Sequence, residues 1–253
     1  SVGAMGAKWL FQLRSAPGQQ TSTLHLFDRF EALGAKKLCK WKTQTSQYKR
    51  TNPAAGGDRV AQDVFLVQFP TDVPDKCFMV AKHGDEDKVM EAASGLHAIW
   101  AMINPTGGNA APLYTQAWTM TVEGWTYDLG DLVMRVGSVV IRNVAQPRGD
   151  DRGGRHDTFK GAVMEVEYLP CADRSESMQL VNEFVEVYCQ PDGPTAVPVS
   201  GFRPATSVVA TRGVGPCGGG PQSLHWQGRT KEYTNEHRAQ QYVALFHAVM
   251  KSS

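Results

Sequence analysis

The feature that most constrains the fold of this chain is a succession of strand-like segments with no helix between them. Residues 37–82 and residues 114–169 contain short stretches that alternate polar and apolar side chains or run apolar between turn residues. Strands joined by short turns pair antiparallel, because a parallel connection needs a long crossover. A sheet this large must close on itself or pack on another layer. The sequence therefore predicts a mainly β domain, a closed or nearly closed antiparallel β-barrel of about eight strands with peripheral helices.

Four segments place apolar residues at helical spacing and predict the helices around this sheet. They cover residues 21–33, 95–103, 173–188 and the C-terminal stretch. The side chains expected to face inward are Leu24, Phe27, Phe30 and Leu33 in the first, Leu96, Ile99, Trp100 and Ile103 in the second, Met178, Val181, Phe184, Val185 and Tyr188 in the third, and Tyr242, Leu245, Phe246 and Val249 in the last.

Residues 1–253 are expected to form a single domain, which is an ordinary size for one hydrophobic core. Residues 191–236 are the exception, because 14 of these 46 residues are Gly or Pro. We expect them to form a long, partly mobile surface insertion. Within the strand region, Gly137-Ser138 is expected to form the turn of a hairpin between residues 132–136 and 139–144.

Composition excludes several classes of protein. The formal net charge of +1 gives no global field for nucleic acid or anionic lipid. No apolar run reaches the roughly 18 residues that a membrane-spanning helix needs, and the N-terminus has no pattern of a secretory signal. The five cysteines include no C-x-x-C pair, which is typical of free thiols in a reducing compartment such as the cytosol or nucleus.

Motifs that could carry chemistry are weak. Residues 213–218 match G-x-G-x-x-G, but Pro216 and the glycines that follow prevent the helix that a dinucleotide site requires. Glu165-x-Glu167 puts two carboxylates on one strand face, as in a metal site of a tunnel-shaped triphosphatase, but no second such pair exists. The other face of this strand carries Ala162, Met164, Val166 and Tyr168 and is apolar enough to be the core face. We therefore expect these carboxylates to face solvent, and we expect no catalytic residue, cofactor site or metal site. A basic strand from Lys36 to Arg50 leaves an RNA-binding barrel as one alternative, although alternation puts Trp41 on the face opposite Lys40 and Lys42. A tunnel-type triphosphate phosphohydrolase is the other alternative.

Several strings occur in a recognisable order along the chain. They are LHLFDRFEALGAKK at 24–37, YDLGDLVMRVGSVVI at 127–141, FKGAVMEVEYLPC at 159–171, NEFVEVY at 182–188 and QYVALFHAVM at 241–250. In this order they resemble the family of Mediator subunit 20, also called the TRF-proximal protein, of which the chain would be a fungal-like or otherwise divergent member. The resemblance covers most of residues 8–189 and 238–251.

The resemblance implies a non-enzymatic subunit of the Mediator head module, acting in the nucleus in the regulation of RNA polymerase II transcription. It implies a barrel with peripheral helices, a heterodimer with Mediator subunit 18, and a tether through the C-terminal segment of subunit 8. Contact with the polymerase would be indirect, through the rest of the head module. No membrane and no direct, sequence-specific nucleic acid contact is implied.

A partner surface is expected where strands carry large apolar groups on both faces. Within residues 114–141 one face can fill a barrel, and the other must meet helices, solvent or a partner. The candidate interface residues are Trp118, Met120, Val122, Leu132, Met134, Val136, Val139 and Ile141.

Overall fold

The computed structural model describes residues 6–14, 23–52, 61–83, 86–103, 112–144, 157–171, 173–189, 195–199 and 233–251. Its centre is one sheet of nine strands in the order β5-β4-β3-β2-β6-β7-β8-β1-β9. Every neighbouring pair is antiparallel, as the runs of consecutive strands predict. The strands are β1 (Ala7–Arg14), β2 (Lys36–Arg50), β3 (Asp63–Phe69), β4 (Val73–His83), β5 (Glu86–Ala93), β6 (Tyr114–Leu129), β7 (Leu132–Asn143), β8 (Asp157–Tyr168) and β9 (Thr195–Pro198).

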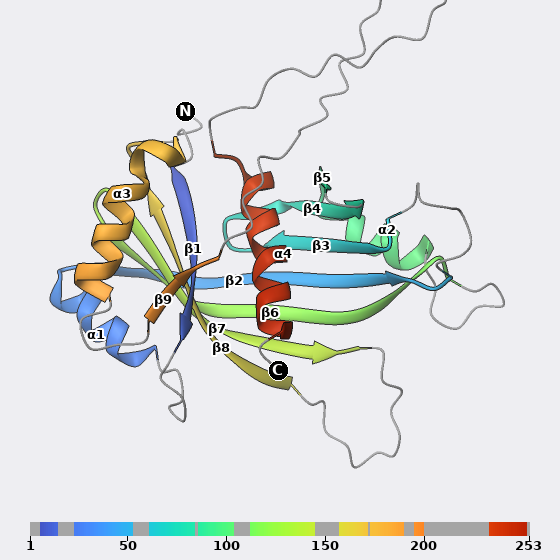
Figure 1. Ribbon diagram of the computed structural model, residues 1–253, viewed down its shortest axis with the longest axis horizontal. Helices are drawn as coiled ribbons and strands as arrows, with labels where there is room; N and C mark the ends of the chain where they lie inside the picture. The colour runs from blue at the N-terminus through green and yellow to red at the C-terminus, as the bar shows by residue number, and fades with distance from the viewer. Residues whose placement is uncertain are drawn as a thin grey trace, which may run out of the picture.

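The sheet is an open half-barrel, so the expectation of a closed or nearly closed barrel is wrong. Its edge strands are β5 and β9, and the described strands contain no pairing between them. The C-terminal helix α4 (Asn235–Lys251) lies across the strands on the concave face (Figure 1) and contacts β1, β2, β3, β4 and β5. The helix therefore occupies the space into which the two edges would have to curl, and its side chains fill the interior in place of a closing strand pair.

Four helices form in the regions where helical spacing predicts them. They are α1 (Leu24–Ala32), α2 (Leu96–Ile103), α3 (Arg174–Phe184) and α4, and α3 continues into a turn of π-helix, η2 (Val185–Cys189). Gly34 has a positive φ of 81° just after α1, as a helix C-terminal cap requires. No helix among the described residues is long and apolar enough to cross a membrane.

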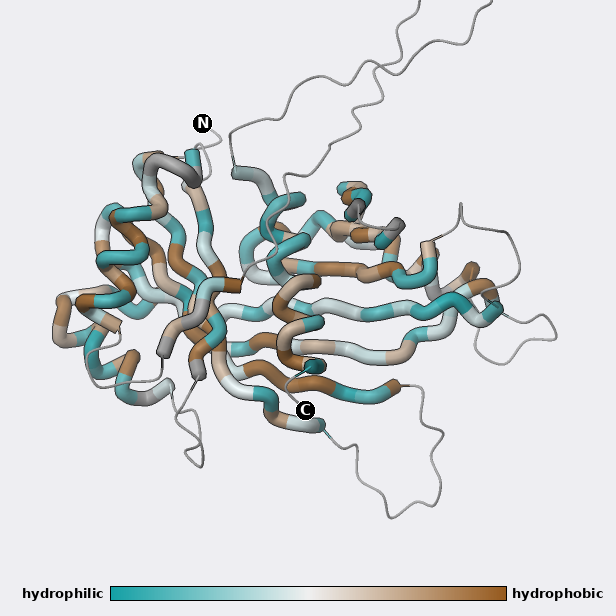
Figure 2. The backbone as a smooth tube through the Cα atoms, in the orientation of Figure 1, coloured by the Kyte–Doolittle hydropathy of each residue, from teal (hydrophilic) through white to brown (hydrophobic). Residues whose placement is uncertain are grey.

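Helices cover both faces of the sheet, which divides the interior into three apolar clusters. The concave face packs against α4 through residues such as Trp41, Phe65 and Phe246. On the opposite face, α1 and α3 cover β1, β6, β7 and β8 at one end, and α2 covers β2, β3 and β4 at the other. Figure 2 shows that α4 itself has a hydrophilic N-terminal half and a more hydrophobic C-terminal half. One helix thus has to satisfy polar neighbours at one end of the concave face and apolar neighbours at the other.

The expected hairpin at Gly137-Ser138 is wrong, because β7 runs without a break through both residues. The turn lies earlier, at Gly130, which has a positive φ of 74° between β6 and β7. Gly137 instead pairs with Gly124 across the two strands, and Trp41 of β2 pairs with Gly124. A Cβ on Gly137 would lie 3.1 Å from the ring of Trp41, so the two glycines leave the space that this indole fills.

Two other expectations need correction. Met178 and Tyr188 are 52% and 45% exposed, so the third helix buries only Val181, Phe184 and Val185 of its predicted set. In the second helix, Ile99 and Ile103 are exposed, because α2 meets the sheet through Leu96 and Trp100.

Part of the predicted insertion is regular structure. Residues 195–198 form β9, which pairs with β1 at the edge of the sheet. Residues 200–232 lie outside the described residues, so the expected mobility of the insertion stays a prediction.

Replacing Gly137 with Ala should destabilise the protein by about 1–3 kcal/mol or more. The added Cβ would lie 2.7 Å from the backbone oxygen of Glu123, and neither strand can move away without breaking the pairing of β6 with β7. Gly95→Ala is the matched control, because a Cβ there meets nothing within 4 Å. Urea denaturation of the two variants measures the difference, and equal losses would contradict the packing argument.

Candidate functional site

The Glu165-x-Glu167 pair lies in the interior, so the expectation that it faces solvent is wrong. Glu165 is 0% and Glu167 is 6% exposed. The residues between and beside them, Met164 and Val166, face the α1–α3 side of β8 as the alternation predicts. The error comes from the second covering layer, because α4 lies over the face that a one-sided sheet would have exposed.

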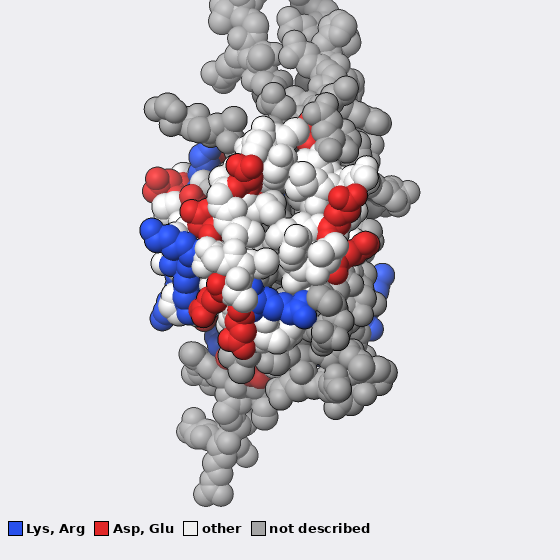
Figure 3. Space-filling model, turned by 90° about the vertical axis from the view of Figure 1, so that its left-hand side faces the viewer, with Lys and Arg blue, Asp and Glu red and all other residues white. Residues whose placement is uncertain are grey.

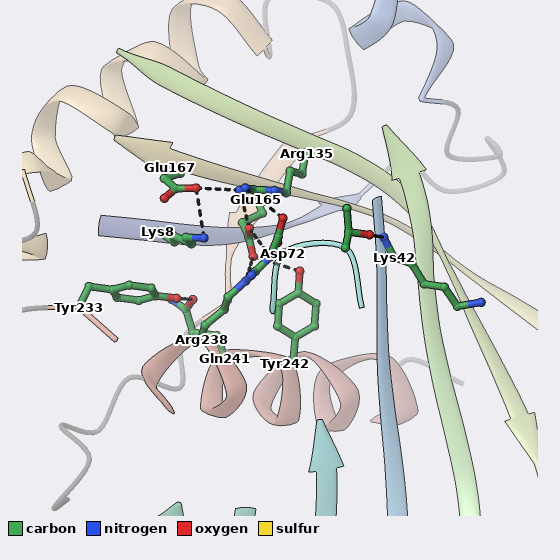
Figure 4. A network of polar contacts seen from close by, with 11 residues as sticks. Lys8, Lys42, Asp72, Arg135, Glu165, Glu167, Tyr233, Arg238, Gln241 and Tyr242 are labelled. Carbon is green, nitrogen blue, oxygen red and sulfur yellow. Dashed lines mark hydrogen bonds and ion pairs between the residues drawn. The ribbon is translucent and has the colours of Figure 1, made fainter. Parts of the chain in front are cut away.

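Arg238 of α4 is the main partner of Glu165 (Figure 4). Its Nε donates to Glu165 Oε2 and its Nη2 to Glu165 Oε1, both at 2.8 Å, in a bidentate pair. Nη2 also lies 2.6 Å from Oδ2 of Asp72, in the turn between β3 and β4. The guanidinium rests on the ring of Phe69, with its central carbon 4.1 Å from the ring centroid. One side chain thus ties α4 to β8 and to the β3–β4 turn.

Arg135 of β7 and Lys8 of β1 complete the cluster. Arg135 Nη1 donates to Glu165 Oε1 at 3.0 Å and to Glu167 Oε2 at 2.9 Å, and Lys8 Nζ lies 3.1 Å from the same Glu167 oxygen. The cluster, which we call the buried ion cluster, balances three cations against three carboxylates. Its members are Lys8, Arg135, Arg238, Asp72, Glu165 and Glu167.

The pKa values follow from burial and from these partners. Burial alone would raise the pKa of Glu165, but the guanidinium groups of Arg238 and Arg135 outweigh it and hold this pKa below its ordinary value. The pKa of Asp72 is lowered against the same opposing effect of burial. Burial, followed by the nearby charge of Arg238, lowers the pKa of Lys8 to about 8. Glu165 and Asp72 are therefore ionised at neutral pH, while Lys8 holds its proton less tightly than an ordinary lysine does.

The arrangement leaves no reactive position at Glu165. One of its oxygens accepts from both arginines, and the other accepts from Arg238 and, at 3.2 Å, from the Tyr242 hydroxyl. No group of three or more potential metal ligands that could hold an ion occurs among the described residues. What the cluster does is hold a helix inside a half-barrel.

Seven of the eight candidate interface residues are buried within the described chain. Met120, Val122, Val139 and Ile141 lie under α4, and Leu132, Met134 and Val136 lie under the other helices. Trp118 is the exception, because it is only partly buried at the edge of the α4 cluster. A partner cannot reach the other seven while the chain keeps this fold. The expectation that a partner covers an apolar surface of this chain stays a prediction. The surface that such a partner contacts must lie outside these seven residues.

The basic strand behaves as its alternation predicts. Trp41 is buried on one face of β2, and Lys40 and Lys42 are exposed on the other. Lys42 lies 2.6 Å from Glu123, and the amine of Lys37 sits 3.9 Å from the centre of the Trp125 ring. These contacts occupy two of the cations with neighbours on β6. The strand therefore does not present free aromatic rings next to free cations, as a single-stranded RNA surface does.

Sequence reasoning identified Glu165 and Glu167 but missed the residues that neutralise them. A signal was present: Arg135 interrupts the apolar run LVMRV, and Arg238 lies at helical spacing with Tyr242 and Leu245 on the buried face of α4. A charge at a core position needs an opposite charge nearby, because an unpaired buried ion is very costly. The spacing of residues in the sequence does not show which opposite charge is the partner.

Removing Arg238 should be far more damaging than removing a surface cation. In Arg238→Met, Glu165 keeps a single cationic donor in a dry site, and we expect a loss of about 3–5 kcal/mol in the free energy of unfolding. Lys42→Met is the matched control, because its pair with Glu123 is exposed and worth less than about 1 kcal/mol. Adding Glu165→Gln to Arg238→Met should recover part of the loss. Chemical denaturation of the four proteins measures this, and similar losses in Arg238→Met and Lys42→Met would disprove the assignment.

Lys8 should make stability depend on alkaline pH. Its folded pKa of about 8 lies below the ordinary value of 10.5, so between these two pH values the unfolded chain binds more protons than the folded chain. The contribution of Lys8 to the free energy of unfolding therefore rises with pH across this window, by about 3 kcal/mol. The difference in stability between the wild type and Lys8→Met should increase in favour of the wild type from pH 8 to 10.5. A difference that stays flat would show that Lys8 is not desolvated.

Comparison with known proteins assigns a family to this fold. A family model described as the TATA-binding related factor (TRF) of subunit 20 of the Mediator complex matches residues 5–247. "Mediator of RNA polymerase II transcription subunit 20b" of Arabidopsis thaliana is 27% identical over 188 residues, which cover 73% of this chain and 75% of the relative. The mouse protein "Mediator of RNA polymerase II transcription subunit 20" is 24% identical over 202 residues, which cover 79% of this chain and 84% of the relative.

A solved chain of the Schizosaccharomyces pombe Mediator head module is 10% identical at a TM-score of 0.37, covering 75% of this chain and 98% of that one. At this level the structural similarity adds nothing to the assignment, which rests on the sequence match. Proteins of the matched family are non-enzymatic transcription coregulator subunits, which confirms that the chain is not an enzyme. With a match that runs through nearly all of its length, the chain belongs to the Mediator subunit 20 family.

Proposed function

We propose that the chain pairs with Mediator subunit 18 as a subunit of the head module in the nucleus. In this role it is tethered through the C-terminal segment of subunit 8 and supports the regulation of RNA polymerase II transcription through protein contacts alone. The observation that carries the proposal is the family match over residues 5–247, together with relatives whose names place them in RNA polymerase II transcription.

Exposed apolar side chains support a role in an assembly. On α2, Ile99 is 53%, Met102 is 77% and Ile103 is 61% exposed, and the helix contains no Asp, Glu, Lys or Arg. Further exposed apolar groups lie on α3 and η2. Apolar residues gathered in this way mark contact surfaces more often than they mark a free monomer. A subunit of a large complex has partners that cover such areas.

The phosphohydrolase alternative is not favoured by the geometry of the buried ion cluster. The carboxylates that would hold a divalent cation are engaged by Arg238, Arg135 and Lys8. The RNA-binding alternative is not favoured either, since Trp41 and the lysines of β2 lie on opposite faces of the strand.

Co-expression with subunit 18 and the C-terminal segment of subunit 8 from the same species tests the proposal. We expect a stable complex on gel filtration, because a lasting subunit interface buries about 1,000 Å² or more. Gly95→Ala, which leaves the fold and the exposed helices intact, should enter the complex like the wild type. A wild-type chain that stays monomeric and never co-elutes with subunit 18 would refute the pairing.

A further inference from the structure

The end of the molecule formed by α1, α3 and η2 exposes apolar side chains that the described chain does not cover. Leu180 is 43%, Val187 is 60% and Tyr188 is 45% exposed. Leu180 of α3 and Val187 of η2 are exposed on the side of this helical segment that faces away from the core, an area called here the apolar stripe, and the exposed Glu183 lies between them in the sequence. Val181, Phe184 and Val185 hold the other side of the same helix in the core. Figure 3 shows this end of the molecule, with an uncharged area at its centre, Asp and Glu side chains on several sides of it, and Lys and Arg side chains on its left and below it.

The turn of π-helix shapes this surface. Within η2, Val185 and Cys189 are buried while Val187 and Tyr188 point outward. The ring of Tyr188 packs against Phe184, with centroids 5.4 Å apart, and the carbonyl of Tyr188 accepts a hydrogen bond of 3.3 Å from Arg29 of α1. The apolar stripe is therefore held by the fold and joined to α1. Turns of this kind within helices are often found at functional sites.

Carboxylates dominate the border of the stripe. The described charged side chains of α1, α3 and η2 comprise four exposed carboxylates and one guanidinium, that of Arg29. The guanidinium donates a hydrogen bond to the carbonyl of Tyr188, and the four carboxylates outnumber this one cation. An apolar stripe with an acidic border is complementary to a helix that carries apolar anchors flanked by Lys and Arg. The four carboxylates are Asp28, Glu31, Glu183 and Glu186.

We propose that the surface made by Leu180, Val187, Tyr188 and the four carboxylates, here called the acidic-rimmed stripe, binds a basic amphipathic segment of another protein chain. The apolar side of that segment lies on Leu180 and Val187, and its Lys and Arg side chains reach the carboxylates of α1, α3 and η2. This goes beyond pairing with subunit 18, because it specifies the chemistry of the occupant and applies to any chain that carries it.

Photo-cross-linking from the full chain tests this surface directly. Benzoyl-phenylalanine replaces Val187 in one variant and, as a control, Lys49 in another, which is exposed near the opposite end of β2. Each protein is illuminated in nuclear extract, and the cross-linked peptide is sequenced by mass spectrometry. The proposal expects a dominant adduct from position 187 alone, whose peptide has Lys or Arg beside apolar residues spaced three or four apart.

A second step measures the role of charge. The captured peptide is synthesised, and its affinity for the wild type is compared by fluorescence anisotropy with that for Glu183→Lys/Glu186→Lys. We expect at least tenfold weaker binding to the double variant and unchanged binding to Glu123→Lys, which reverses an exposed carboxylate of β6. Circular dichroism checks that each variant keeps the fold.

The opposing outcomes are equally specific. An acidic or uncharged captured peptide, a second copy of this chain, equal adducts from both positions, no adduct, or an affinity unaffected by the double variant would each overturn the proposal. A basic amphipathic peptide from a protein outside Mediator would support the acidic-rimmed stripe while counting against the assembly role, which the co-expression test measures separately.

Discussion

The pairing of Arg238 with Glu165 and Asp72 is the interaction on which the rest of the structure depends. It fixes α4 inside the half-barrel, and α4 supplies the apolar side chains that fill the concave face. Burying Tyr242, Leu245, Phe246 and Val249 stabilises the fold by about 1.5–3 kcal/mol each, but apolar contact has no preferred direction. The bidentate geometry and the second carboxylate constrain both the rotation of the helix and its position along its axis. Apolar contacts alone would leave α4 freer to slide along the sheet. A helix that slides would hold the two edges of the sheet apart less firmly.

Helices on both faces of the sheet explain where this protein can and cannot meet a partner. The strands β6, β7 and β8 are buried on either side, so their large apolar residues belong to the core of the subunit. Within the part of the chain that the structure describes, the surfaces left for other chains include the outer sides of the helices and the two edge strands. Among these, α2 exposes apolar side chains and contains no Asp, Glu, Lys or Arg, whereas the end with α1, α3 and η2 combines exposed apolar groups with carboxylates. The two ends of the molecule therefore expose surfaces of different chemistry.

The same architecture accounts for the structural role of Glu165 and Glu167 on β8. The carboxylates of β8 face the interior, where cations from β1, β7 and α4 neutralise them. The cationic side chains of the protein therefore occupy the places beside these carboxylates that a metal ion or a cationic substrate would need. A carboxylate pair on a strand is therefore ambiguous: the same spacing serves a reactive site when the concave face is open, and a structural anchor when a helix fills it.

The sequence by itself largely determined where the strands and helices lie along the chain. Alternation placed the strands and showed that Trp41 and the lysines of β2 face opposite ways, and helical spacing placed α1 to α4. These features depend on periodicity within one segment, which the chain carries in its residue order. The turn at Gly130 rather than Gly137, the burial of Glu165 and Met134, and the open edges at β5 and β9 depended on tertiary structure. Each of these depends on which distant element covers which face. Only when α4 packs across the concave sheet does a strand that looks solvent-facing become an interior one, because burial is a property of neighbours in space.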